Sequence, residues 1–138
     1  MAVEQTLILA KPDAIRRSLA GEIVARFERR GFRLRAARLL TVDRPLAKEH
    51  YAEHQAKPFF GELVEFITSG PTLAFVLEGE GVITTARTTI GATNPADAGP
   101  GSIRGDFASA MPDNLVHGSD SPESAAREIA LWFPDGLV

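Results

Sequence analysis

The pattern of apolar and polar positions predicts four strands distributed along the chain. Residues 6–10 form a short apolar run with β-branched members, which is typical of a buried strand. Residues 72–77 give the clearest strand pattern, and residues 114–117 are short and strand-like. The first run ends at Lys11, and the proline that follows either stops the strand or opens a helical turn.

The remaining strand, the second in chain order, is expected over residues 32–42, with one face formed by Phe32, Leu34 and Ala36. The alternation breaks at Arg38, where a bulge or a bend is expected.

Helical spacing predicts the connecting elements. One helix contains Ile23, Val24 and Phe27 and ends at Gly31, and a last long helix begins at Ser121-Pro122, a cap residue followed by proline. Further helices are expected over residues 45–51, 59–67 and 81–90, whereas two prolines and two glycines mark residues 94–102 as a loop.

This order of elements gives a βαββαβ core and an α/β (α+β) fold. It predicts an antiparallel sheet with helices packed over one face. The length of 138 residues favours one domain, 1–138.

Composition narrows the range of functions. The chain has no cysteine, which excludes disulfides and thiolate metal sites, and its formal charge of −3 argues against dedicated nucleic-acid binding. No apolar run has the ~20 residues needed to span a bilayer, and the first five residues do not resemble a signal peptide. We therefore expect a cytoplasmic protein without a membrane partner.

His117 is the first candidate for chemistry. It closes a predicted strand and precedes Gly118, which permits close backbone approach, and Ser119, whose hydroxyl can orient the ring. A neutral imidazole is a good nucleophile. Glu128 falls on or beside the apolar stripe of the last helix, where a carboxylate needs a partner and can orient a histidine. A structural histidine and a simple Glu–Lys or Glu–Arg ion pair remain open as alternatives.

Candidate phosphate ligands are Lys11, at the end of a buried strand, Arg87, and Arg104, which follows the loop rich in proline and glycine. Phosphoryl transfer needs such donors around a dispersed negative charge, and Thr93 can add a hydroxyl. For each of these cations taken alone, a solvated surface position is the better explanation. No P-loop motif is present.

The pair Phe59-Phe60 begins a predicted helix, so one ring can enter the core while the other stays exposed. An exposed ring can stack a nucleobase without reading its identity. The arginine run over residues 26–38 is compatible with nucleic-acid binding, but a solvated face explains it better in an acidic protein.

Several motifs, in order along the chain, resemble those of nucleoside diphosphate kinases. Residues 114–120 read NLVHGSD and resemble the active-site signature of that family. The others are LAKPD at 9–13, YAEH at 51–54, KPFF at 57–60, FITSGP at 66–71, Arg87 with GAT at 91–93, and PGSIRGD at 100–106.

The resemblance implies a ferredoxin-like core and a role for each matching residue. His117 would be the phosphorylated nucleophile, with Glu128 and Ser119 holding its ring. Other residues would surround the nucleotide: Lys11 and Tyr51 near the transferred phosphate, Arg87, Thr93, Arg104 and His54 on phosphates, Asn114 on the ribose, Phe59 stacked on the base, and Met111 on the other side of the base.

The same resemblance implies ping-pong transfer of a γ-phosphate from a nucleoside triphosphate such as ATP to a diphosphate such as GDP. Mg²⁺ would be held by the phosphates and water rather than by the protein. The chain would assemble from dimers into a homo-hexamer, with a homo-tetramer as the alternative. A binding module without turnover, and a phosphatase or mutase that uses a phosphohistidine, remain alternatives at this stage.

Overall fold

The computed structural model describes residues 2–138 and contains a four-stranded antiparallel sheet in the order β2-β3-β1-β4. The strands are β1 (Val3–Ala10), β2 (Arg33–Thr41), β3 (Pro71–Glu80) and β4 (Val116–Gly118). The predicted four-stranded antiparallel sheet is therefore confirmed.

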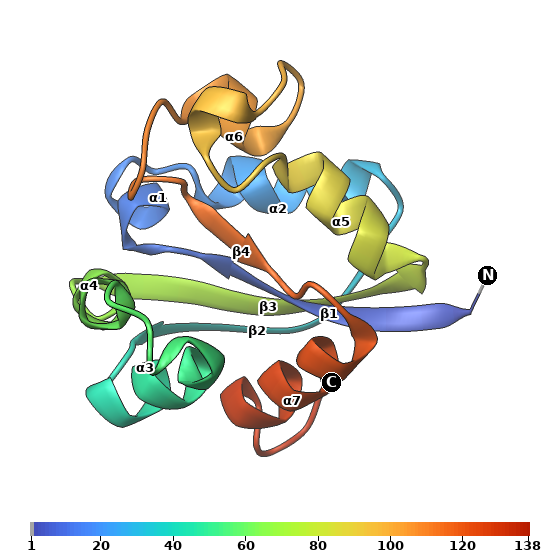
Figure 1. Cartoon of the computed structure of the whole chain (residues 1–138). Coiled ribbons are helices and arrows are strands. Elements are labelled where there is room, and N and C mark those ends of the chain that lie inside the picture. The colour runs from blue at the N-terminus through green and yellow to red at the C-terminus, as the bar shows by residue number, and fades with distance from the viewer. Residues whose placement is uncertain (1) are drawn as a thin grey trace.

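The helices lie on both faces of this sheet (Figure 1), so the expectation of a single covered face is wrong. One hydrophobic cluster joins Ile8 and Phe75 to α1, α2 and α5, and the other joins Leu7 and Val76 to α3, α4 and α7. Residues 7–10 and 74–77 are fully buried. A central strand that is covered on both faces has a continuous apolar run instead of an alternating pattern. The apolar run at residues 6–10 therefore already indicated that helices cover both faces of the sheet.

The helices and 3-10 turns connect the strands in the predicted order. Their bounds are α1 (Pro12–Arg16), α2 (Ala20–Arg29), α3 (Arg44–His50), η1 (Ala52–His54), α4 (Phe60–Ile67), α5 (Val82–Ile90), η2 (Pro95–Asp97), α6 (Ile103–Phe107) and α7 (Pro122–Trp132). Side chains of Asp43, Ser102 and Ser121 accept from backbone N–H groups at the starts of α3, α6 and α7. Helix α6 and turn η2 lie in or next to the segment predicted as a loop.

Strand β2 has its irregularity earlier than expected. The register with β3 shifts between Leu34 and Ala36, while Arg38 pairs regularly with Ala74. Leu34 therefore faces the same side as Leu77, and Ala36 faces the opposite side with Val76. The predicted bulge at Arg38 and the predicted shared face of Leu34 and Ala36 are both wrong, because the inserted residue reverses the alternation.

Within residues 2–138, no helix combines the length and the apolar character that crossing a membrane requires.

Candidate active site

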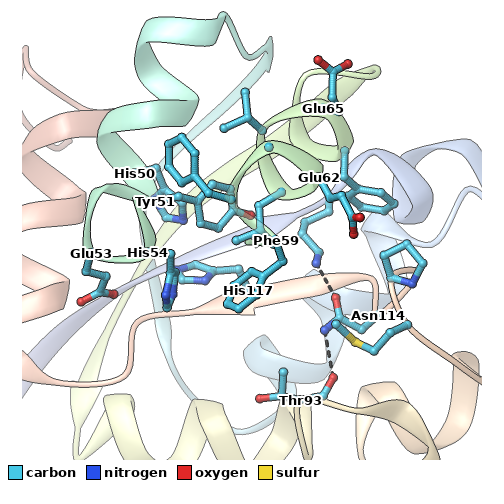
Figure 2. Close-up of a pocket in the computed structure, with 18 of the residues that line it drawn as sticks. His50, Tyr51, Glu53, His54, Phe59, Glu62, Glu65, Thr93, Asn114 and His117 are labelled. Carbon is cyan, nitrogen blue, oxygen red and sulfur yellow. Dashed lines mark hydrogen bonds between the residues drawn. The ribbon is translucent and has the colours of Figure 1, made fainter. Parts of the chain in front are cut away.

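A cavity of about 1220 Å³ opens between the α3–α4 segment on one side and β4 with its preceding loop on the other (Figure 2). All of the site residues predicted from the sequence line this cavity except Ser119, which lies behind it. The lining members are Lys11, Tyr51, His54, Phe59, Arg87, Thr93, Arg104, Met111, Asn114, His117 and Glu128. Residues far apart in the chain therefore converge on a space large enough for a nucleotide.

His117 lies in the middle of β4, opposite Leu9 of β1. Its Nε2 is 2.9 Å from Oε1 of Glu128, a buried carboxylate on α7. Because a carboxylate only accepts, Nε2 carries the proton, and Nδ1 is left with its lone pair. The side chain of His117 remains 24% exposed, so this ring is accessible from the cavity.

Ser119 contacts Glu128 instead of the imidazole ring. Its hydroxyl donates to Glu128 Oε1 at 2.8 Å and accepts from the Leu7 N–H at 3.2 Å. Burial opposes the charge of Glu128, but hydrogen bonds from His117 and Ser119 outweigh it and hold the pKa of that carboxyl below its usual range. Ser119 thus orients the carboxylate that orients His117.

Gly118 separates these two residues for a steric reason. A Cβ on Gly118 would lie 2.7 Å from Cδ1 of Ile90, so a larger residue there would require the end of the Ile90 side chain to move.

His50 is a further residue of the site that sequence reasoning missed. It is 3% exposed at the end of α3, and its ring meets that of His117 edge to face, with centroids 4.7 Å apart. The Trp132 indole N–H donates to its Nδ1 at 3.0 Å. Burial lowers the pKa of His50 to about 3, so the ring is neutral. The sequence signal that could have identified His50 is its position one helical turn after Ala47, which places both residues on the same, buried face of the helix.

Three cations line the opposite part of the cavity. Arg104 is 6% exposed and donates to the carbonyls of Gly91, Asn114 and Val116, which leaves part of its guanidinium free for a ligand. Burial, followed by the charge of Arg87, lowers its pKa to about 10.

Arg87 comes from α5 and donates to the Gly118 carbonyl at 3.0 Å. Lys11 follows β1, and burial lowers its pKa to about 8. Nearby negative charge compensates these three positive groups only in part, which favours the binding of an anionic ligand.

Asn114 links the cations to the loop after α5. Its Oδ1 accepts from Lys11 Nζ, and its Nδ2 donates to the Thr93 carbonyl at 2.9 Å, as the dashed lines in Figure 2 show. The side chain is 3% exposed and therefore held in one orientation at the cavity wall.

The rim of the cavity is more apolar. Phe59 is 42% exposed and Met111 is 49% exposed, whereas Phe60, the first residue of α4, is partly buried and packs against the hydrophobic cluster of α3, α4 and α7. The rings of Phe59 and His54 lie 5.7 Å apart. Tyr51 faces the cavity beside His117 in Figure 2, and burial raises its pKa to about 12, so its hydroxyl keeps its proton.

The arginine run lies away from this cavity and is largely paired. Arg26 contacts Asp106 at 2.7 Å and Arg35 contacts Glu78 at 2.7 Å. Arg38 donates to the Trp132 carbonyl at 3.0 Å.

Comparison with known proteins gives a consistent result. A model described as nucleoside diphosphate kinase matches residues 4–138. The nucleoside diphosphate kinase of Brevibacillus brevis is 61% identical over 131 residues, 95% of this chain and 89% of that protein. Nucleoside diphosphate kinase 1 of Spinacia oleracea is 57% identical over 136 residues, 99% of this chain and 92% of that protein.

Solved structures agree in fold. A halophilic nucleoside diphosphate kinase from Halobacterium salinarum, in complex with CDP, has a TM-score of 0.95 at 46% identity, covering 99% of this chain and 92% of that one. A nucleoside diphosphate kinase family protein from Babesia bovis has a TM-score of 0.94 at 45% identity, covering 98% and 92%.

Proposed function

Because the chain belongs to the nucleoside diphosphate kinase family, we propose that His117 is the residue that carries the phosphate. The reaction is a reversible ping-pong transfer of the γ-phosphate from a nucleoside triphosphate to a nucleoside diphosphate through a phosphohistidine. The observation that supports His117 is the hydrogen bond of 2.9 Å between its Nε2 and the acceptor Glu128, because in the neutral ring this bond places the lone pair on Nδ1, and His117 lines the cavity.

In the first half-reaction, the lone pair of His117 Nδ1 attacks the γ-phosphorus. The bond from that phosphorus to the β,γ-bridging oxygen breaks, and the nucleoside diphosphate leaves with the electron pair. The ring gains positive charge as the N–P bond forms, and the carboxylate of Glu128 stabilises that charge. A second nucleoside diphosphate then reverses these steps and takes the phosphate.

Lys11, Arg87 and Arg104 are the proposed phosphate ligands, with Thr93 and His54 as further donors. Positioning and electrostatic stabilisation supply most of the catalysis in phosphoryl transfer. Tyr51 keeps its proton and can therefore donate a hydrogen bond near the transferred group.

Asn114 would contact the ribose, with Lys11 next to it. Phe59 would stack on the base, and Met111 would line the other side. A stacking ring does not read base edges, so this arrangement explains broad tolerance of base and sugar.

Mg²⁺ is proposed as the cofactor, bound through the nucleotide. Within residues 2–138, one group of histidine and acidic side chains has ligand atoms within 4.8 Å of one another, namely His50, His117 and Glu128. The His117–Glu128 hydrogen bond and the Trp132–His50 hydrogen bond already occupy atoms of this group. Mg²⁺ prefers oxygen ligands and commonly uses substrate phosphates, where it would neutralise charge on the transferred group.

We further propose that residues 1–138 form one nucleoside diphosphate kinase domain and that it acts in the cytoplasm. Its assembly would be a homo-hexamer built from dimers, with a homo-tetramer as the alternative. Analytical ultracentrifugation distinguishes the two, because their masses differ by a factor of 1.5.

A two-step label transfer tests the reaction. The protein is incubated with Mg²⁺ and ATP labelled on the γ-phosphate, the nucleotide is removed, and acid-labile, base-stable label is measured. Unlabelled GDP or CDP is then added in separate samples. We expect label on the protein that passes to either diphosphate.

The control variant is His117→Gln. Its amide can replace the ring nitrogen that contacts Glu128, so the variant should fold. It lacks a nucleophile, so it should take up no label. Label on that variant, or no label on the folded wild-type protein, would refute the assignment. Label removed only by water would indicate a phosphatase.

A further inference from the structure

Asp13 is a buried carboxylate that the reaction described above does not use. It lies in the first turn of α1 and is 3% exposed. Its Oδ2 accepts from the backbone N–H of Leu115 at 2.9 Å, across 102 positions of the chain. Its Oδ1 is buried without a hydrogen-bond partner in the described part of the chain. A carboxylate in such a place needs a reason, because burying charge is costly.

The backbone that Asp13 holds is strained. Leu115 has a φ of 69°, in the left-handed region that branched residues avoid. The Leu115 carbonyl in turn accepts from the Lys11 N–H at 2.9 Å. Residues 11–13 therefore fix both sides of this residue, which stands between Asn114 at the cavity wall and the start of β4.

Asp13 also acts through its charge. Burial lowers the pKa of Lys11 to about 8, and the negative charge of Asp13 is the strongest influence in the opposite direction. Arg104 lowers the same pKa, while exposed Asp113 raises it. The charge of Asp13 likewise opposes the lowering of the Arg104 pKa.

We propose that Asp13 is a positioning residue of the phosphoryl-transfer site: it holds the left-handed turn at Leu115, and its buried charge acts on Lys11, two residues earlier in the chain. This inference rests on the proposed roles of Lys11 and Asn114. Asp13 itself touches neither the nucleotide nor the reacting atoms.

The variant Asp13→Asn separates charge from geometry, because the amide oxygen still accepts from Leu115 while the charge is lost. The chain has three lysines, Lys11, Lys48 and Lys57. With lysine labelled at Cε with ¹³C, the exposed Lys48 and Lys57 serve as internal references for the titration of Lys11 in the nucleotide-free enzyme.

We expect Lys11 to titrate near pH 8 in the wild-type enzyme. In Asp13→Asn we expect a midpoint lower by about one pH unit, the lower end of the effect of a nearby opposite charge. The alkaline limb of kcat/KM reports groups of the free enzyme and should move with it. At pH 6.5 the two enzymes should agree within about twofold, and a merely structural role would produce no such change of the pH profile.

Two further variants test the geometry and the specificity. Asp13→Ala also removes the group that accepts from the Leu115 N–H, so its Tm should lie below that of Asp13→Asn. Its kcat/KM should be about tenfold below that of the wild-type enzyme even at pH 6.5. Asp113→Asn makes the same chemical change at an exposed position, where solvent screens the charge, so its effect on Lys11 should be smaller.

The charge role is refuted if Lys11 titrates at the same pH in Asp13→Asn as in the wild-type protein. The holding role is refuted if Asp13→Ala matches Asp13→Asn in kcat/KM at every pH. A wild-type enzyme that never acquires label on His117 would overturn the proposed function instead, and the lysine titration would still test the effect of Asp13 on Lys11.

Discussion

The hydrogen bond between Glu128 and His117 gives the sharpest prediction about rate. Glu128→Gln preserves the size of the side chain and an oxygen that can accept from Nε2, but it removes the negative charge. A hydrogen bond to a charged group contributes about 1.5–3 kcal/mol and a neutral one about 0.5–1.5 kcal/mol. The loss of about 1–1.5 kcal/mol corresponds to about tenfold in rate.

The loss should appear in the chemical step, because positive charge on the His117 ring develops only as the N–P bond forms. We therefore expect Glu128→Gln to lower the single-turnover rate of His117 phosphorylation about tenfold, with unchanged ADP affinity. Glu128→Ala removes the acceptor as well, and we expect a loss of about 100-fold, at the upper end for residues that orient a reacting group.

Rapid-quench experiments with γ-labelled ATP measure this rate, and calorimetric titration with ADP measures binding. Glu123→Gln is the matched control, because Glu123 lies exposed in the first turn of the same helix, α7. It should stay within about twofold of the wild-type rate. A Glu128→Gln enzyme that phosphorylates His117 at the wild-type rate, or one whose loss lies equally in ADP affinity, would show that the charge of Glu128 does not assist the chemical step.

Three other predictions follow from buried or exposed groups of the site. Ser119→Ala leaves the buried N–H of Leu7 unpaired, which costs about 1–3 kcal/mol and should lower the calorimetric Tm by about 3–9 °C; an unchanged Tm would contradict this. His50 has its pKa lowered by burial from 6.5 to about 3. The unfolded chain therefore takes up a proton below pH 6.5 that the folded protein excludes, and stability falls by about 1.4 kcal/mol per pH unit from this residue. In denaturant titrations, the free energy of unfolding of the wild-type protein should fall relative to that of His50→Phe between pH 6 and pH 4. A difference between the two proteins that stays constant over this range would contradict this. Phe59→Ala should raise KM for ATP, GTP and CTP alike by about 5- to 150-fold, since stacking contributes about 1–3 kcal/mol per base; a steady-state effect on one base alone would oppose a stacking role.

Much of the fold could be predicted from local pattern. The apolar runs at β1 and β3, and the cap followed by proline at the start of α7, depend on neighbouring residues only. The helical spacing from Ala125 to Trp132 placed Glu128 on or beside the buried face of α7, and the structure shows that Ala125, Glu128 and Trp132 are all buried.

The remaining features depend on contacts between distant segments. Helix α6 spans only Ile103–Phe107, and Arg104 within it donates to carbonyls of the α5 end and of the segment before and within β4. No local pattern reports these partners. The bulge of β2 likewise appears only in its register with β3, because β2 is an edge strand with mostly exposed side chains.

The charges of the site connect its stability with its function. Lys11 and Arg104 are buried beside each other, and burial lowers the pKa of both. The free enzyme therefore holds positive charge in a place that disfavours it, and a bound polyphosphate supplies the missing negative charge. In the nucleotide placement that we propose, binding energy is concentrated on the phosphates, the part that every nucleotide shares, and the base meets the exposed ring of Phe59 at the rim. This division would explain how one site can discriminate strongly for a phosphate chain and weakly among bases.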